Sequence, residues 1–557
     1  MPEASYRHGT APARRGTTRR AGAVAIMVAV VAVGTGAAAH AQGPAAPHAV
    51  GVTSQASDST SFVSKIAWTS TSPVRGVTLL SGSYANPTSH PYWTITIQAP
   101  TTSPSTGTSE EAEAGSPTWA RSTEAALVAD GFSPSATTLP WPAYTDDPHG
   151  VMGVRVRVGQ FATQAAATPT ASELTADGFA PEVEWSGFDA TPAPDAELVH
   201  VAVIDPRQFN GRVFASHGPA IASRTTAQAA SAALGAVAAT NGGFFTIDAP
   251  EANYVGGVDT GLSVQNGVVE SLANGDRAAA VFGADNRVSI QNVSSSAVLR
   301  AADGSSVRVL GVNRVPGIAE DCGVAGFTPT THPQQNTVCT GSNDIVAFTP
   351  QFGAPLPPAP SSGPALQVVV DPRGQIVSAG APGGALPAGD WAVQAIGTDE
   401  AWLASHANVG ARLSLSEQLW TGSGHRLELT PATTVTSAGP MLVQNGRTAI
   451  DAVTEGVLDP PDLNDYTFSA YRHARTMIGV DREGRILLAT VDGIAGVSEG
   501  MTLTEEASLM RSLGAVDAMN LDGGGSTQFA SFGQVLDDPS SNPLRPVGDT
   551  VEVVPSK

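Results

Sequence analysis

Cysteine is almost absent from this sequence. Of its 557 residues only Cys322 and Cys339 are cysteines, and both lie in one stretch rich in Gly, Thr and Pro. Two cysteines without a nearby histidine pattern make a poor zinc site, and a catalytic thiol is expected even less. In an oxidising compartment they most simply form a disulfide, which closes a loop of about 17 residues and stabilises the fold by roughly 3 kcal/mol.

Positive charge is also scarce. The chain has 29 Lys and Arg against 50 Asp and Glu, a formal net charge of -21. Such an acidic chain repels the phosphate backbones of DNA and RNA, so no nucleic-acid partner is expected. Charged residues make up 14% of the chain and hydrophobic residues 41%, which excludes bulk disorder. With its many glycines and prolines, this composition favours β-rich folds joined by long loops, in two or more folded units.

Long apolar runs are missing beyond the N-terminus. The first 41 residues contain arginines at positions 14, 15, 19 and 20, a small apolar run from Ala21 to Ala38 and the A-x-A site Ala39-His40-Ala41. This order predicts a signal peptide over residues 1–41 that is removed on export, with a membrane anchor as the alternative. We therefore expect a secreted or cell-wall associated protein with no stable membrane span after cleavage.

An internal repeat occupies residues 89–187, after a linker and possible first strand over residues 42–88. In each copy an alternating strand is followed by a helix, a glycine that ends the helix (Gly131 or Gly178) and a second strand. Two such β-α-β units predict a small sheet with two helices on one face. The V-x-V-G-x-F pattern of residues 156–161 resembles the sporulation-related repeat (SPOR) domain, a family that binds glycan strands of peptidoglycan through its sheet face. The alternative is a structural module without a ligand.

A second duplication links two distant strands. Residues 234–241 and 513–520 share the pattern L-G-A-V-x-A-x-N, and each copy leads into a glycine cluster. Each follows a helix that begins at threonine, and Gly235 and Gly514 stand where glycine is favoured after a helix end. The two asparagines, at positions 241 and 520, therefore stand at the carboxyl ends of short strands, where sheet-based sites usually lie. We expect both ends to meet at one site.

The rest of the chain predicts a β-rich mixed α+β domain over residues 192–557. Six of its motifs resemble the phosphodiester glycosidase family, which includes the lysosomal enzyme that uncovers mannose-6-phosphate by removing N-acetylglucosamine. In the family's order they are N-G-G-F-F (241–245), G-P-M-L-V-Q-N-G (439–446), R-T-x-I-G (475–479), V-D-G (491–493), G-M-T-L-x-E (500–505) and N-L-D-G-G-G-S (520–526). The resemblance implies an exported hydrolase that cleaves a sugar-1-phosphodiester in cell-wall or exopolysaccharide material, without a cofactor. One departure is Ala474, where the family often has proline.

The residue types in these motifs suit that reaction, because its substrate carries an anion on the anomeric oxygen. Arg475 offers a planar bidentate donor, and the glycine clusters allow backbone N–H groups to point at an anion. Hydrolysis of a glycosidic bond usually uses two carboxylates, and the candidates are Asp492, Glu505 and Asp522. The expected substrate and phosphate contacts are Asn241, Gly242, Gly243, Arg475, Asn520, Gly523, Gly524 and Gly525.

Each candidate also has a structural explanation. Glu505 follows Thr502 by three residues, which is the spacing of a helix capping box. Asp492 precedes glycine as in a type I′ turn, Arg475 could pair with a surface carboxylate, and Asp522 could cap its own turn. No metal is assigned, because no metal-ligand spacing is present; a divalent ion shared by Asp492 and Asp522 stays open as an alternative. The competing function is a non-catalytic protein that binds cell-wall glycan.

Overall fold

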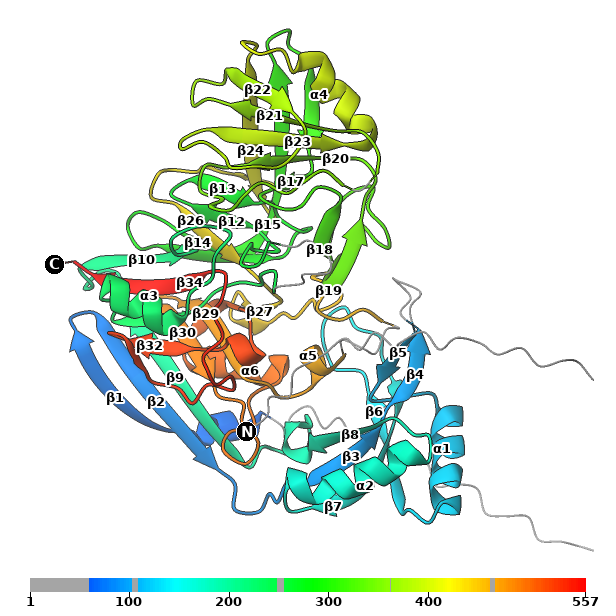
Figure 1. The fold of residues 1–557 in the computed structure, drawn as a ribbon. Helices are drawn as coiled ribbons and strands as arrows, with labels where there is room; N and C mark the ends of the chain where they lie inside the picture. Colours follow the sequence, from blue (N-terminus) through cyan, green and yellow to red (C-terminus); the bar gives the residue numbers. More distant parts are fainter. Residues whose placement is uncertain (1–59, 103–108, 248–254, 361, 461–465, 557) are drawn as a thin grey trace, which may run out of the picture. The chain divides into compact units, whose positions relative to one another are not determined.

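The computed structural model describes residues 60–102, 109–247, 255–360, 362–460 and 466–556. The expected signal peptide over residues 1–41 and residues 42–59 of the expected linker lie outside these ranges. Strands predominate among the described residues and the helices are short (Figure 1). The helices are α1 (Pro117–Ala129), α2 (Gln164–Ala176), α3 (Ala227–Leu234), α4 (Glu400–His406), α5 (Tyr466–Ala470) and α6 (Leu503–Ser512). None of them is long and apolar enough to cross a membrane.

An eight-stranded antiparallel sheet carries most of the motifs. Its order is β1-β2-β9-β30-β29-β31-β27-β28, and β31 ends at Asn520. β1 and β2 come from the segment expected to be a linker with a possible first strand, and β2 pairs with β9 along its whole length. The strands are β1 (Ala67–Val74), β2 (Val77–Ala85), β9 (Ala196–Ile204), β30 (Ile486–Val491), β29 (Arg475–Asp481), β31 (Ala515–Asn520), β27 (Met441–Gln444) and β28 (Arg447–Thr448).

A five-stranded sheet of order β10-β34-β11-β32-β33 carries the first glycine cluster, because β11 ends at Asn241. Its apolar side chains, among them Val213 and Val551, share one hydrophobic core with Leu488 and Met519 of the eight-stranded sheet. Each large side chain buried in such a core contributes about 1.5–3 kcal/mol. The shared core fixes the two strand ends relative to each other. The strands are β10 (Gly211–Ser216), β34 (Thr550–Pro555), β11 (Ala238–Asn241), β32 (Phe529–Ser531) and β33 (Gln534–Val535).

A second eight-stranded sheet follows the order β13-β12-β26-β14-β15-β24-β25, and β16 also pairs with β15. Its first hairpin turns at Asn266 (φ 51°) and Gly267 (φ 79°), the left-handed pair of a type I′ turn, for which Asn-Gly is the favoured sequence. The strands are β12 (Ser263–Gln265), β13 (Val268–Ser271), β14 (Ala278–Phe282), β15 (Val288–Ala301), β16 (Ser306–Val309), β24 (Leu413–Thr421), β25 (Arg426–Leu427) and β26 (Thr434–Ser437).

Two further β units lie between β16 and β24 in the chain. One is a five-stranded sheet of order β17-β20-β23-β21-β22, which packs in one core with α4 and with side chains of β15, β16 and β24. The other is a hairpin of β18 and β19, joined by the expected disulfide between Cys322 and Cys339 with a Cα–Cα distance of 5.3 Å. The strands are β17 (Gly311–Val312), β18 (Ile318–Cys322), β19 (Pro333–Thr340), β20 (Asp344–Phe348), β21 (Ala365–Val370), β22 (Ile376–Gly380) and β23 (Trp391–Ile396).

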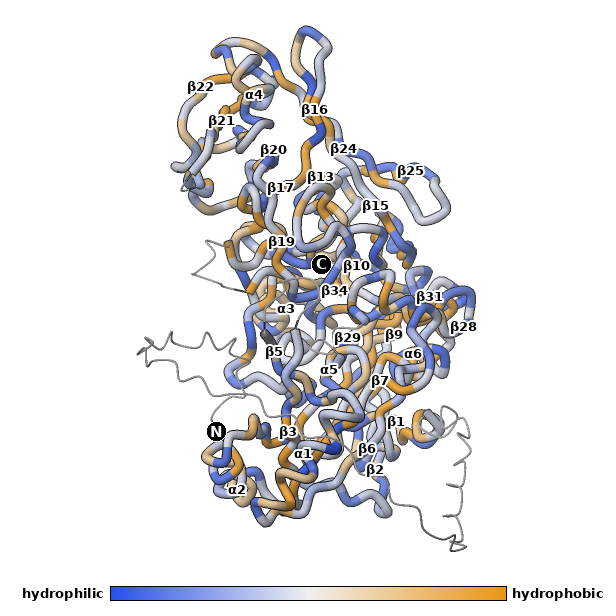
Figure 2. Tube along the Cα trace, turned by 90° about the vertical axis from the view of Figure 1, so that its right-hand side faces the viewer, coloured by the Kyte–Doolittle hydropathy of each residue, from blue (hydrophilic) through white to orange (hydrophobic). Residues whose placement is uncertain are grey.

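The repeat region forms a β-α-β-β-α-β module with sheet order β6-β7-β3-β8. α1 and α2 cover one face, where Ile95, Leu127, Val156 and Leu174 form a separate core; Figure 2 marks the hydrophobic residues of β3 and α1. Both helices end before a left-handed glycine, as the repeat predicts. The strands are β3 (Trp93–Ile97), β6 (Pro134–Pro140), β7 (Val151–Phe161) and β8 (Pro181–Trp185), with a hairpin of β4 (Ala99–Thr102) and β5 (Ser109–Ala112) at the side.

The opposite face of this module is polar and covered. Arg155 and Arg157 on β7 are 6% and 8% exposed, and both form ion pairs with Asp189 at 2.7 and 2.6 Å. Arg155 also donates to the hydroxyl of Tyr471 at 2.6 Å. The face to which the SPOR resemblance assigns glycan binding is therefore occupied by contacts from the same chain.

Candidate active site

The two duplicated strand ends are joined by direct hydrogen bonds. The side-chain amide of Asn241 donates to the carbonyl of Asp522 at 2.6 Å, and the backbone N–H of Asp522 donates to the carbonyl of Gly242 at 3.0 Å. The hydroxyl of Thr476 donates to Oδ1 of Asn241 at 2.7 Å. The structure thus brings together the two clusters that the duplication predicts to meet.

Local sequence explains why both strands reach this point. Thr226 caps α3 and Thr502 caps α6, each accepting a hydrogen bond from the N–H three residues later. Gly235 (φ 67°) and Gly514 (φ 98°) then turn the chain out of each helix, which few other residues do without strain. Each short strand that follows runs through the core and ends at its asparagine, where the two glycine clusters meet.

Both asparagines hold the backbone and are fully buried. The amide of Asn520 donates to the carbonyl of Gly439 at 2.7 Å, and Asn241 links β11 to the second glycine cluster as described. Their side chains therefore position the site, and neither is open to a substrate in the described structure.

Most of the glycine N–H groups that were expected to bind an anion donate instead to acceptors of the protein itself. This corrects the prediction of an open anion site. The N–H groups of Gly242 and Gly243 donate to Asp549, to its carbonyl at 3.0 Å and to its carboxylate at 2.7 Å. Those of Gly523 and Gly524 donate to the Asp522 carboxylate at 2.8 Å and to the carbonyl of Ala474 at 2.7 Å. These donors shape the two turns instead of facing solvent.

Asp522 is the predicted catalytic carboxylate that remains partly accessible. It is half-buried, and burial raises its pKa from 3.8 to about 6, while the Ser526 hydroxyl, the Gly523 N–H and Arg545 lower it. A pKa close to neutrality lets a carboxyl group accept and release a proton under working conditions. This side chain is therefore suited to acid–base chemistry at the junction.

Arg545 lies beside Asp522 and was not predicted from the sequence. Its guanidinium packs against Gly525, where a Cβ would come within 2.5 Å of Nη2. The side chain is partly exposed, and within the described part of the chain its guanidinium makes neither a hydrogen bond nor an ion pair. A partly exposed guanidinium with free donors is a suitable ligand for a phosphate group.

Asp549 and Asp259 form a second acidic pair next to the first glycine cluster. Asp549 is buried and accepts from the N–H of Gly243; burial raises its pKa. Asp259 forms an isolated antiparallel β-bridge with Phe245. Burial, together with the charge of Asp549, raises the pKa of Asp259 well above its usual range. No sequence motif includes either residue, and Asp549 contacts Gly243, which lies 306 residues earlier in the chain.

Arg475 is fully buried, so the structure does not present it as an open phosphate donor. Nε donates to the carbonyl of Met501 at 2.8 Å, and Nη2 donates to the carbonyl of Phe468 at 2.6 Å. Nε also pairs with Glu506 at 3.1 Å. Most donors of the guanidinium hold neighbouring segments, and this network positions the chain that leads into β29.

Glu505 is also fully buried and has the structural role that its spacing allows. It completes the capping box with Thr502, and it accepts a bidentate ion pair from the equally buried Arg472 at 2.8 Å. With its carboxylate occupied in this way, Glu505 is a positioning residue for α6 in the described structure.

Asp492 lies at the end of β30, 1% exposed, and Oδ2 accepts from the N–H of Asp538 at 3.0 Å. Burial raises its pKa to about 8. Neither Asp492 nor Gly493 has a positive φ, so the type I′ turn is absent. The same loop reaches the second glycine cluster, because Ser540 donates to the carbonyl of Gly524 at 2.9 Å. Asp492 therefore anchors the loop that borders Asp522.

Across the described ranges, no group of three or more His, Cys, Asp or Glu side chains is arranged to hold a metal ion.

Part of this chain is similar to a known protein family. A family model described as phosphodiester glycosidase matches residues 366–554, a range that includes every motif of the resemblance except N-G-G-F-F. The chain is 38% identical over 82 residues to the prophage-derived protein YomE of Bacillus subtilis. It is 42% identical over 69 residues to N-acetylglucosamine-1-phosphodiester alpha-N-acetylglucosaminidase of Mus musculus. These segments cover 15% and 12% of this chain, and each spans only 13% of the relative.

A solved structure matches over a much larger part of the chain. It is the crystal structure of a protein from Burkholderia pseudomallei, which is named as an exported protein. The likeness has a TM-score of 0.77 at 28% identity and covers 88% of this chain and 96% of the other. The architecture is therefore shared with a known protein, and the segment that carries Asp522 and Arg545 is similar to a phosphodiester glycosidase domain.

Proposed function

We propose that this chain is an exported hydrolase that cleaves sugar-1-phosphodiesters, with Asp522 and Arg545 at the centre of its site. The observation that carries the proposal is a half-buried carboxyl group with a pKa of about 6 beside a guanidinium with free donors. The match of residues 366–554 to a phosphodiester glycosidase model supports the same reaction class. The predicted signal peptide supports export and a substrate in cell-wall or exopolysaccharide material.

Arg545 binds the phosphate group of the substrate. A phosphodiester carries one negative charge, and the phosphate monoester that leaves after cleavage carries up to two. A fixed cation beside the leaving oxygen therefore stabilises the transition state more than the bound substrate, which is the condition for catalysis. The planar fork of arginine can hold two phosphate oxygens at once.

Asp522 activates the water that replaces phosphate at the anomeric carbon. With a pKa of about 6 it is mostly ionised at pH 7 and can accept the proton of that water. A phosphate monoester is a weakly basic leaving group, so it needs less protonation than the alkoxide of an ordinary glycoside. Asn241 donates to the backbone carbonyl of Asp522 and is itself held by the hydroxyl of Thr476, so the backbone that carries this carboxyl group is fixed.

A product analysis on simple substrates tests the proposal. The purified protein is incubated with the methyl phosphodiesters of glucose 1-phosphate and N-acetylglucosamine 1-phosphate and with a teichoic-acid-like polymer. We expect free sugar and methyl phosphate from the small substrates, whereas cleavage on the other side of phosphorus would give methanol and sugar 1-phosphate. Asp522→Asn should lose this activity, and Arg447→Ala, which removes an exposed arginine on β28, should keep it. The proposal is wrong if no substrate releases sugar or if Asp522→Asn matches the wild type.

A further inference from the structure

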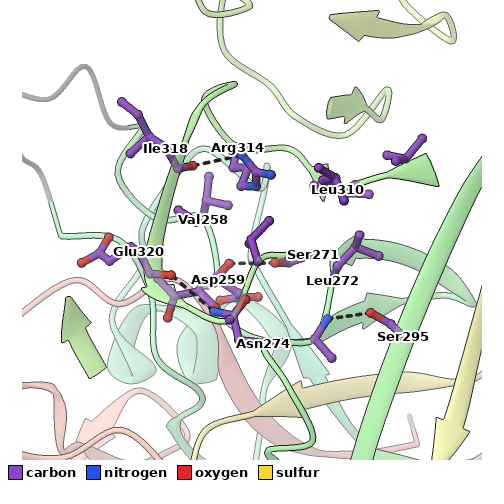
Figure 3. A pocket seen from close by; sticks show the side chains of 18 of the residues that line it. Val258, Asp259, Ser271, Leu272, Asn274, Ser295, Leu310, Arg314, Ile318 and Glu320 are labelled. Atoms are coloured by element: carbon purple, nitrogen blue, oxygen red, sulfur yellow. Dashed lines mark hydrogen bonds between the residues drawn. The ribbon is translucent and has the colours of Figure 1, made fainter. Parts of the chain in front are cut away.

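A cavity of about 90 Å³ lies beside the first glycine cluster (Figure 3). It opens between the segment that precedes β12, the segment that follows β13, part of β15, and the segments around β16 to β18. Figure 3 shows Asp259, Ser271 and Asn274 together on one side of the cavity, with Val258 and Ile318 on the other. Arg314 lies beside Ile318 and donates to its carbonyl, so the lining mixes polar and apolar side chains.

One lining residue of this cavity, Thr260, contacts the segment that follows the first glycine cluster. The N–H of Thr260, a lining residue, donates to the carbonyl of Phe244 at 3.0 Å, just after the first glycine cluster. The hydroxyl of Thr260 donates to Asp321 at 2.9 Å, and the charge of Asp321 acts on Asp522 and raises its pKa. Thr260 and Asp321 thus link the cavity to the segment around Asp522.

Two carboxyl groups of the lining have oxygens without a partner among the described residues. They are Oε2 of Glu320 and Oδ1 of Asp259, and both atoms are buried. A buried polar atom without a hydrogen bond costs about 1–3 kcal/mol, so a ligand that supplies donors binds favourably here. Burial and the neighbouring Asp321 raise the pKa of Glu320 to about 8, so it also carries a proton to donate near neutral pH.

The lining combines two carboxyl groups, Asp259 and Glu320, with two arginines. Of the two arginines that line it, Arg314 is bound to Asp344 at 2.7 Å and Arg308 is exposed. Groups that both accept and donate next to apolar side chains are suited to the hydroxylated, uncharged edge of a sugar ring, which has C–H and O–H groups side by side. A hydrogen bond of this kind contributes roughly 1 kcal/mol, which corresponds to about a fivefold change in affinity.

We propose that the cavity is the sugar subsite of the enzyme, in which Glu320 and Asp259 recognise ring hydroxyl groups while phosphate lies at Arg545. This inference rests on the proposed function and assigns an orientation to its substrate. Glu320 is then a specificity-determining residue, and it takes no part in breaking the bond.

Rates on deoxygenated substrates test this orientation. The substrates are the methyl phosphodiesters of glucose, 2-deoxyglucose and 3-deoxyglucose 1-phosphate. For the wild type we expect kcat/KM to fall at least fivefold when a recognised hydroxyl is missing. In Glu320→Gln that selectivity should shrink, mainly through KM. Glu417→Gln on β24 is the matched control, because burial also raises the pKa of Glu417, to about 7, and this residue does not line the cavity.

A binding measurement without turnover separates this inference from the proposed function. Saturation-transfer NMR with methyl α-glucoside should show contact with the wild type and loss of contact in Glu320→Gln and in Ala325→Phe, which fills the cavity from an exposed lining position. Equal selectivity and equal sugar contact in all variants would overturn the subsite, even if phosphodiesters are hydrolysed. Sugar contact that depends on Glu320 in a protein without hydrolytic activity would support the subsite and refute the enzyme.

Discussion

Replacing Asp522 with asparagine should abolish activity and, at neutral pH, raise stability. The rise of its pKa from 3.8 to about 6 means that the folded protein holds the ionised carboxylate less favourably than the unfolded chain does. The difference corresponds to about 3 kcal/mol, and because the group is only half-buried we expect about 1–3 kcal/mol. Asparagine keeps an oxygen that can accept from the N–H of Gly523, so the turn should survive.

The pH dependence gives the sign of this effect. A folded-state pKa above the unfolded value costs stability once the pH exceeds both, and the cost disappears as the carboxyl group becomes protonated in both states. The variant should therefore melt at higher temperature than the wild type at pH 7, and the two should converge as the pH falls from about 6 towards 4. Wild-type kcat/KM should rise through about pH 6, because the proposed base must be ionised.

Thermal melts and initial rates on the same preparations, from pH 4 to pH 8, provide the measurement. Asp285→Asn, at an exposed turn position, is the control and should leave both quantities unchanged. An Asp522→Asn variant that is less stable than the wild type at pH 7, or that keeps its turnover, would refute this reasoning about the second glycine cluster.

Three other substitutions test the remaining assignments. Arg545→Lys keeps the charge but loses the planar fork, so kcat/KM on phosphodiesters should fall roughly ten- to hundredfold; unchanged initial rates would exclude it as the phosphate ligand. Glu505→Gln leaves Arg472 buried without its carboxylate and should lower the free energy of unfolding by about 3–5 kcal/mol, while the folded fraction keeps its kcat; a stable but inactive variant would return Glu505 to the catalytic set. Cys322→Ser with Cys339→Ser should cost roughly 3 kcal/mol in chemical denaturation, and an unchanged denaturation midpoint would contradict this.

Features encoded by neighbouring residues were predictable from the sequence. The Asn266-Gly267 turn, the capping box of Thr502 and the glycine after α3 each depend on a few consecutive residues, so their local pattern is sufficient. The meeting of the two strand ends was predictable for another reason, because a duplicated pattern that ends in asparagine suggested equivalent roles.

Features set by distant contacts were not predictable. Arg545 and Asp549 precede β34 in a loop without periodicity, and their importance depends on Gly525 and Gly243 in other parts of the chain. Arg475 stands in a recognisable motif. The motif does not show whether the guanidinium faces solvent or, as here, donates to backbone carbonyl groups inside the protein. Pairing of β2 with β9 spans more than a hundred residues, and no local signal distinguishes such a strand from a linker.

This pairing makes the small module an insertion between two adjacent strands of one sheet. The chain leaves the sheet at Asn86 and returns at Asp195, where the N–H of the first donates to the carbonyl of the second at 2.6 Å. A truncation from the N-terminus would remove β1 and β2 together with the module. The effect of losing the module could then not be separated from the effect of losing two edge strands of the sheet. The two ends are close enough to be joined by a short Gly-Ser connection that keeps the flanking strands intact, but excision would also uncover Tyr471, whose hydroxyl accepts from Arg155 of the module.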